Sequence, residues 1–157
     1  MKIRPEGLGL WIAYPSMALA QYKDWRGIAR AVKTLGGQWL AVRTTDPLLA
    51  GLALDAAISA CRAEGVAWYG WHYSYPDASR VSTQVAHMQR CRDAGASGHI
   101  INAEIEFTAK PGEARRLLER VRTVLPDWYV AHAPLGWIDY HPTWPYEVFD
   151  AFCDDTH

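Results

Sequence analysis

The chain has 157 residues, of which 50% are hydrophobic and 21% charged, and its formal net charge is -1. This composition is typical of one globular domain with its own core, and the near-neutral charge gives no indication of nucleic acid as a partner. No apolar run approaches the length of a membrane span, and the N-terminus lacks the apolar segment of a signal peptide. We therefore expect synthesis in the cytoplasm without export, and no membrane partner.

Aromatic residues are the unusual feature of the composition, with eight tryptophans and eight tyrosines. Such rings fill cores, and they also stack on planar or sugar surfaces. The three cysteines, Cys61, Cys91 and Cys153, are widely spaced and form no C-x-x-C motif. Because Cys61 and Cys91 lie in apolar helical patterns, we expect buried thiols rather than disulfides or a zinc site.

Five apolar, aromatic or β-branched runs predict five β-strands. They begin near Leu8, Gln38, Val66, Gly98 and Trp128. These starts are about 30 residues apart, which is the repeat of a βα unit in an eight-stranded barrel of roughly 250 residues.

Amphipathic patterns between these runs predict helices. The helical patterns cover 25–35, 48–64, 81–91 and 114–125, the last opening with Pro111 in its first turn and stopping at Pro126. Strict alternation of strand and helix predicts a parallel sheet with right-handed crossovers, either open and doubly wound or closed as a barrel.

The run from Gly98 to Phe107 favours the barrel. Its polar positions, Asn102, Glu104 and Glu106, alternate with the apolar positions Ile101, Ala103, Ile105 and Phe107. A central strand of a doubly wound sheet is apolar on both faces, whereas a barrel strand can point polar groups inward near its mouth. No glycine-rich phosphate loop follows the first strand, which also argues against a nucleotide-binding fold.

Five strands are too few for a closed barrel of eight. We therefore expect a partial parallel (β/α) barrel of TIM type, with about five βα units in a single domain over residues 1–157 that lacks the C-terminal units. The alternative is an open or self-pairing sheet. Either way, unpaired strand edges and an apolar interior predict self-association, or pairing with a segment that completes the sheet.

Glu104 and Glu106 are the candidate catalytic residues. Two residues apart on a strand, they would share a face with their Cα atoms roughly 6.5–7 Å apart. An acid beside a carboxylate is what glycoside hydrolysis requires, one group protonating the leaving oxygen while the other stabilises or attacks the sugar cation. The alternative is that either glutamate forms a structural ion pair with Arg43 or another base.

Candidate substrate-binding residues lie near the same end of the predicted strands. They are Asn102, Arg43, His72, Tyr73, His132 and Trp144. Asn102 would orient a glutamate or a substrate amide, and Arg43 would bind an anion or fix Glu104. His72 and Tyr73 end the third strand, where they would form part of an aromatic floor for a sugar.

His132, in the fifth strand, would face the lumen, and Trp144 would stack on sugar from the proline-rich loop that follows. For each of these residues the alternative is a packed or hydrogen-bonded structural role. His72, His132 and the two glutamates show no sequence-local metal-ligand spacing. We therefore expect no metal and no cofactor.

The segment GHIINAEIEF resembles the IDAE-x-E strand of a glycoside-hydrolase-like barrel domain found in phage and bacterial proteins. That group is distantly similar to the lysozymes of glycoside hydrolase family 25. The segments GLGLWIAY, YGWHYSYPDAS and DYHPTWPYEVFDAFCD agree with the same family. The resemblance spans nearly the whole chain and implies the first five units of the barrel.

The family's acidic pair carries over onto Glu104 and Glu106. Asn102 stands where the family pattern has Asp, and the first-strand Asp of family 25 lysozymes has no counterpart in residues 10–14. The residues and the resemblance together predict a glycoside hydrolase acting on peptidoglycan-like or other polysaccharide, with Glu104 as acid/base. The alternative is a non-catalytic glycan-binding or structural barrel module associated with phage.

Overall fold

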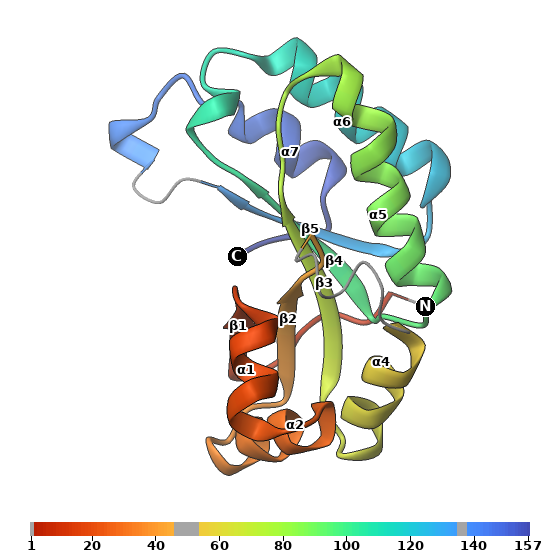
Figure 1. Ribbon diagram of the computed structural model, residues 1–157. Helices are drawn as coiled ribbons and strands as arrows, with labels where there is room; N and C mark the ends of the chain where they lie inside the picture. The colour runs from red at the N-terminus through yellow and green to blue at the C-terminus, as the bar shows by residue number, and fades with distance from the viewer. Residues whose placement is uncertain (1, 46–53, 135–137) are drawn as a thin grey trace.

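The computed structural model describes residues 2–45, 54–134 and 138–157, which form a single sheet of six strands (Figure 1). The strands are β1 (Gly9–Ile12), β2 (Trp39–Arg43), β3 (Ala67–Tyr73), β4 (Gly98–Ala103), β5 (Tyr129–Pro134) and β6 (Asp155–Thr156). Each pairs in parallel with the next strand along the chain. The strand order of the described residues therefore does not reverse, as it would in a doubly wound sheet. The sheet is a curled half-barrel, which confirms the predicted partial barrel of TIM type.

The described residues also form six α-helices and three short 3₁₀ turns. The helices are α1 (Pro15–Tyr22), α2 (Trp25–Thr34), α4 (Leu54–Ala63), α5 (Val81–Asp93), α6 (Pro111–Val124) and α7 (Tyr146–Phe152). The 3₁₀ turns are η1 (Ala78–Arg80), η2 (Ile105–Phe107) and η3 (Ile138–Tyr140). Figure 1 shows α1, α2 and α4 beside the first three strands, and α5, α6 and α7 beside the last strands.

Local sequence signals explain where the helices begin and end. The Asp24 side chain caps α2 by accepting a hydrogen bond from the backbone nitrogen of Gly27 at 2.7 Å. After α2, Gly36 adopts a φ of 79°, and the nitrogen of Gly37 donates to the carbonyl of Val32 at 2.8 Å. The predicted helices are confirmed at α2, α5 and α6. The helix predicted over 48–64 is confirmed from Leu54, and its first residues lie outside the described residues.

The two faces of the sheet are filled differently. On the outer face, which we call the helix face, aliphatic residues of the strands pack against the helices in two clusters. On the inner, concave face the core consists largely of rings, namely Trp39, Tyr69, Trp71 and Tyr129, with Ala41, Ile100, Ala131 and Ala133 between them. The Tyr69 ring lies 5.9 Å from Trp39 and 5.8 Å from Tyr129. Large aromatic rings thus fill the concave side of the sheet, where no strand of the described residues lies opposite them.

Two expectations about the strands are wrong. The fourth strand was expected to run to Phe107, but β4 ends at Ala103 and η2 follows it. The turn forms because the nitrogen of Phe107 bonds the carbonyl of Glu104 at 3.1 Å and the Phe107 ring packs on Phe149, with centroids 5.3 Å apart. Five strands were expected, the fifth being the last and therefore an edge, but the two residues of β6 pair with it.

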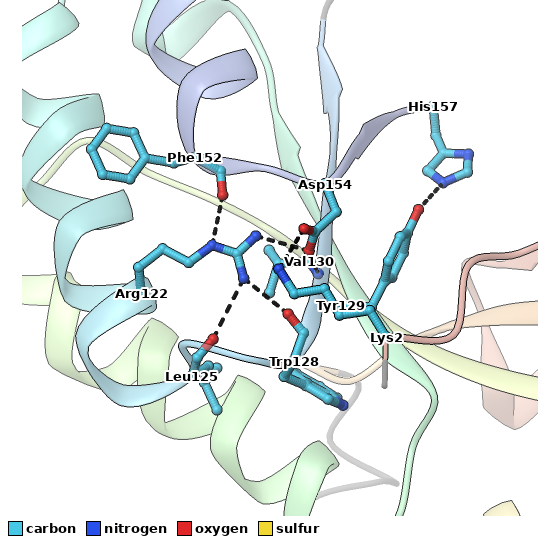
Figure 2. A network of polar contacts seen from close by, with 9 residues as sticks. All are labelled: Lys2, Arg122, Leu125, Trp128, Tyr129, Val130, Phe152, Asp154 and His157. Atoms are coloured by element: carbon cyan, nitrogen blue, oxygen red, sulfur yellow. Dashed lines mark hydrogen bonds and ion pairs between the residues drawn. The ribbon is translucent and has the colours of Figure 1, made fainter.

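A polar network holds β6 in place (Figure 2). The Arg122 guanidinium contacts the carbonyl of Phe152 at 2.6 Å and the carboxylate of Asp154 at 2.9 Å. That carboxylate also accepts from the nitrogen of Val130 at 2.9 Å and from the Lys2 ammonium at 2.6 Å. Burial by itself would raise the pKa of Asp154, but these hydrogen bonds hold it below its usual value. The network ties α6, β5 and both chain ends together.

Candidate functional site

Three predicted site residues meet on the concave face where β2, β3 and β4 end. Arg43, Tyr73 and Asn102 lie at or next to the last residue of their strands, each two positions after a concave-face core residue. The register places Tyr73 opposite Asn102 and Arg43 opposite Trp71. The carboxyl ends of barrel strands are where functional groups usually lie. We call Arg43, Tyr73, Asn102 and Glu104 the mouth.

Glu104 directly follows β4 and is held through both its backbone and its side chain. The indole nitrogen of Trp144 donates to the Glu104 carbonyl oxygen at 2.9 Å. The amide nitrogen of Asn102 donates to Oε1 of Glu104, also at 2.9 Å. The charge of Glu104, some desolvation, and a hydrogen bond to the same carboxylate raise the pKa of Tyr73. The mouth therefore places a hydrogen-bonded carboxylate beside a tyrosine hydroxyl.

A row of aromatic rings runs from the first strand to this carboxylate. We call Trp11, Trp71 and Tyr73 the aromatic strip. Trp11 and Trp71 have ring centroids 5.3 Å apart, and those of Trp71 and Tyr73 are 5.7 Å apart. Trp11 and Tyr73 are each 41% exposed. The strip offers open ring surface on the concave face, which is the kind of surface that stacks on sugars.

Trp11 and Tyr14 were not among the predicted site residues. The guanidinium of Arg43 lies over the Tyr14 ring, 5.4 Å from its centroid. The alternation of residues along the first strand was a signal that could have identified Trp11. Leu10 and Ile12 pack toward the helices, so Trp11 between them lies on the opposite face.

Glu106 does not share a strand face with Glu104, so this part of the prediction is wrong. It lies in the turn η2 and lines a hollow of about 380 Å³ between the segment after β3 and the start of α6. Its neighbours in that hollow include Arg80, Lys110 and Glu113. The carboxylate pair expected from strand geometry is therefore not formed, because the strand ends before either glutamate.

His72 faces away from the mouth, which corrects its predicted place in an aromatic floor. It is 1% exposed, and its Nδ1 lies 2.7 Å from Nε2 of His99, with which it shares a hydrogen bond on the helix face. Burial lowers the pKa of His72 to about 4, and burial also lowers the pKa of His99. Since His72 is one residue out of phase with Tyr73, it points to the other side of the sheet.

His132 and Trp144 also belong to the helix face, so their predicted places in the lumen and at a sugar-stacking rim are wrong. His132 is 1% exposed and Trp144 is 3% exposed. Their rings stack at 5.9 Å with an interplanar angle of 10°, and His132 hydrogen-bonds Asp150 at 2.9 Å. The loop containing Trp144 is fixed by its aromatic residues onto the core.

A hollow of the concave face lies at the opposite end of the sheet from the mouth. It has a volume of about 490 Å³ and is lined by the N-terminal segment 2–6 together with Gln38, Trp39, Ala67 and Tyr69. None of the predicted site residues lines it. In parallel barrels this end of the strands usually serves stability, so the mouth is the better candidate.

The described residues contain neither a metal-binding cluster nor a membrane-spanning helix. Over residues 2–45, 54–134 and 138–157, no three side chains of His, Cys, Asp or Glu gather in a metal-binding group. No helix in these ranges has the length and apolar character needed to cross a bilayer.

Comparison with known proteins gives a fold but no family. No family model and no curated protein matches the chain. The carboxyl transferase domain of Rhizobium etli pyruvate carboxylase with 3-bromopyruvate superposes with a TM-score of 0.63 at 13% identity, covering 94% of this chain and 26% of that one. The same domain with 3-hydroxypyruvate gives 0.59 at 14% identity, covering 91% and 24%.

The chain thus spans about a quarter of the length of these structures. Identity this low carries information about the arrangement of the backbone and none about the reaction. The comparisons and the strand order agree that the chain forms a parallel-stranded α/β half-barrel of TIM type.

Proposed function

We propose that this protein binds and hydrolyses a polysaccharide at the mouth, with Glu104 as the acid/base group. The observation that carries the proposal is the Glu104 carboxylate, hydrogen-bonded by Asn102 and standing beside the exposed ring of Tyr73. Glycosidases combine a carboxyl group with ring surface that positions the sugar. The sequence resemblance to glycoside-hydrolase-like barrel domains of phage and bacteria supports a peptidoglycan-like glycan as substrate.

The chemistry available to a single carboxyl group is a proton cycle. Protonated Glu104 gives its proton to the glycosidic oxygen, the bond from the anomeric carbon to that oxygen breaks, and the sugar is left as a cation. Water then adds to the anomeric carbon and its proton returns to Glu104, so that hydrolysis is balanced. The aromatic strip would hold the sugar rings, and Arg43 would bind an anionic substituent.

A second candidate is a non-catalytic glycan-binding or structural module, as in a phage-associated barrel. The position of Glu106 favours it, because this glutamate lines a separate hollow and does not supply a second carboxylate beside Glu104. Asn102 also favours the non-catalytic module, because it stands where the family pattern has an Asp. A binding module would use the aromatic strip without the proton cycle.

Turnover of purified cell-wall glycan by the wild type and by two matched variants separates the candidates. Glu104→Gln keeps the shape of the side chain and removes the exchangeable proton, so we expect a loss of activity on the order of hundreds-fold. Glu106→Gln makes the same change outside the mouth and should retain wild-type turnover. A wild type that binds the glycan without cleaving it would establish the binding module. Full activity in Glu104→Gln would remove Glu104 from the mechanism.

A further inference from the structure

The indole of Trp68 is buried without the hydrogen bond that other tryptophans of this fold make. Four of them donate their indole N–H to a backbone carbonyl oxygen at 2.9–3.3 Å, namely Trp39, Trp71, Trp128 and Trp144. Trp68, the second residue of β3, is 1% exposed. Within residues 2–45, 54–134 and 138–157 its indole nitrogen has no acceptor. A buried donor left in this way destabilises the fold, so such groups are rare in folded proteins.

Trp68 lines a hollow of about 300 Å³ on the helix face, at the end of the sheet opposite to the mouth. The hollow lies where the last turn of α4 meets the start of β3 (Figure 1). Its walls are largely apolar and include Ile3, Ile58, Val66 and Ala67. A hollow of this volume is large enough for a small molecule.

The N-terminal segment supplies a movable part of this lining, the side chain of Ile3. The backbone of Ile3 is held, because its carbonyl oxygen accepts a hydrogen bond from the Tyr69 hydroxyl at 3.1 Å. The side chain is 54% exposed, and exposed side chains change rotamer rapidly. The wall of the hollow can therefore open toward the indole without any rearrangement of the sheet.

Arg62 and Ser97 bring further hydrogen-bond donors to the same hollow. Arg62 lies in the last turn of α4 and donates from one nitrogen to the carbonyl of Gly95 at 2.5 Å. This bond orients the guanidinium, which carries five N–H donors in all. Among the described residues of the lining, Arg62 is the only charged one. The hollow therefore combines apolar walls with donors and a positive charge.

The end of α4 does not oppose a negative charge with free carbonyl groups. The nitrogen of Gly65 donates to the carbonyl of Arg62 at 2.9 Å, and the nitrogen of Val66 donates to the carbonyl of Cys61 at 3.0 Å. These bonds satisfy carbonyls that would otherwise be exposed at a helix C-terminus.

We propose that this hollow binds a small carboxylate with an apolar body, of the size of an aromatic or short-chain aliphatic acid. An ionised carboxylate only accepts hydrogen bonds, whereas the Trp68 indole and the Arg62 guanidinium only donate them. The bond from a guanidinium to a carboxylate is among the stronger hydrogen bonds in proteins. The apolar body packs against Ile58 and Val66, which removes it from water. The binding is independent of the hydrolysis proposed for the mouth.

Binding is tested by titrating ¹⁵N-labelled protein with benzoate in the millimolar range and following the indole N–H signals by NMR. The Trp68 signal is assigned in the wild type by its contacts with its own backbone protons. We expect that signal to shift saturably, because its N–H gains an acceptor, while the signal of Trp11 at the mouth stays in place. Benzyl alcohol, which has the same ring and no charge, should produce a much weaker effect. A Trp68 signal that benzoate does not move would overturn the proposal.

Two matched arginine variants test the recognition of the carboxylate by calorimetric titration with benzoate. Arg62→Gln removes the positive charge of the hollow, so we expect the affinity to fall on the order of tenfold. Arg116→Gln makes the same change on the exposed side of α6 and should bind like the wild type. Unchanged affinity in Arg62→Gln, or equal affinity of the wild type for benzoate and benzyl alcohol, would refute a carboxylate site.

Discussion

The mouth and the helix face are built from the same strands, yet neighbouring residues of one strand are exposed at the mouth and buried on the helix face. On β3, Tyr73 is 41% exposed at the mouth, whereas His72, one residue earlier, is 1% exposed among helices. The two indoles Trp11 and Trp144 differ in the same manner, at 41% and 3% exposure. Residue type alone would group all four as candidate ligands of a sugar. The comparison shows that the side of the sheet decides between a surface that can bind and a core that only supports it.

The largest expected effect is a difference in stability between two variants, one lacking a ring on the helix face and the other lacking a ring on the concave face. Trp144→Ala empties a core site between His132 and Phe149 and removes the hydrogen bond to the Glu104 carbonyl. We expect a loss of about 3–5 kcal/mol in the free energy of unfolding. Trp11→Ala, made where the ring is open to solvent, should cost much less. Urea denaturation of both variants and the wild type measures the difference.

The two variants should rank in the opposite order when the loss of glycan binding is measured instead of the loss of stability. Trp11→Ala should weaken binding of a cell-wall polysaccharide with little change in stability, because its ring belongs to the aromatic strip. Trp144→Ala, compared at a temperature where it remains folded, should bind more nearly like the wild type. If the variants rank identically in both measurements, the division into a binding side and a supporting side is wrong.

The next largest expected effect is a loss of stability in acid, which arises from the buried histidines of the helix face. The pKa of His72 lies at about 4 in the folded protein against 6.5 for the free side chain, since burial disfavours its charged form. As the pH falls below 6.5 the unfolded chain takes up a proton that the folded protein does not accept until about pH 4. The free energy of unfolding therefore decreases across that window, by roughly 3 kcal/mol from His72 alone.

Urea denaturation at several pH values between 8 and 4 tests this expectation. The double variant His72→Leu/His99→Leu removes both rings of the buried pair and should lose less stability than the wild type as the pH is lowered. An equally steep loss in the double variant would assign the acid sensitivity to other groups.

The smallest expected effect concerns the edge of the sheet at β1. Among the described residues, β1 has a neighbouring strand on one side only. Large apolar side chains are exposed around this edge, namely Ile3, Leu8, Trp11, Tyr14, Met17 and Tyr22. We propose that the protein self-associates through this edge, which light scattering over a range of concentrations would detect as an increasing average mass.

The double variant Leu8→Lys/Met17→Lys places charges on that edge and should reduce the association. A wild type that stays monomeric at every concentration would mean that the rings on the concave face are enough to stabilise the half-barrel on its own.

Much of the fold could be predicted from the sequence because its signals are local and repeated. The apolar runs and the helical patterns predicted five of the six strands and the helices α2, α4, α5 and α6. The strand β6 was missed because two polar residues, Asp155 and Thr156, carry no pattern of their own. They pair with β5 because Arg122 and Asp154 hold the chain beside it. The helices α1 and α7 are short, with seven or eight residues, and periodicity over so few positions is weak.

The candidate site was predicted less well, because it depends on phase and on where a strand stops. Asn102, Tyr73 and Arg43 were predicted near the ends of their strands, and the structure brings them together on one face there, as the register shows. Glu104 and Glu106 were given a shared face that requires β4 to continue past Ala103. The packing of Phe107 against Phe149 ends the strand instead, and Phe149 is more than forty residues away in the sequence.

The sequence by itself determined the alternation of strand and helix, and with it the parallel sheet, because hydrophobic periodicity is a property of each segment alone. It also marked the group of polar and aromatic residues among which a site had to lie. Only the tertiary structure decided which of them reach the mouth. Which residues reach the mouth depends on contacts between distant segments, such as the hydrogen bond from the Trp144 indole to the carbonyl of Glu104. The sequence of one segment does not show which distant segment it will contact.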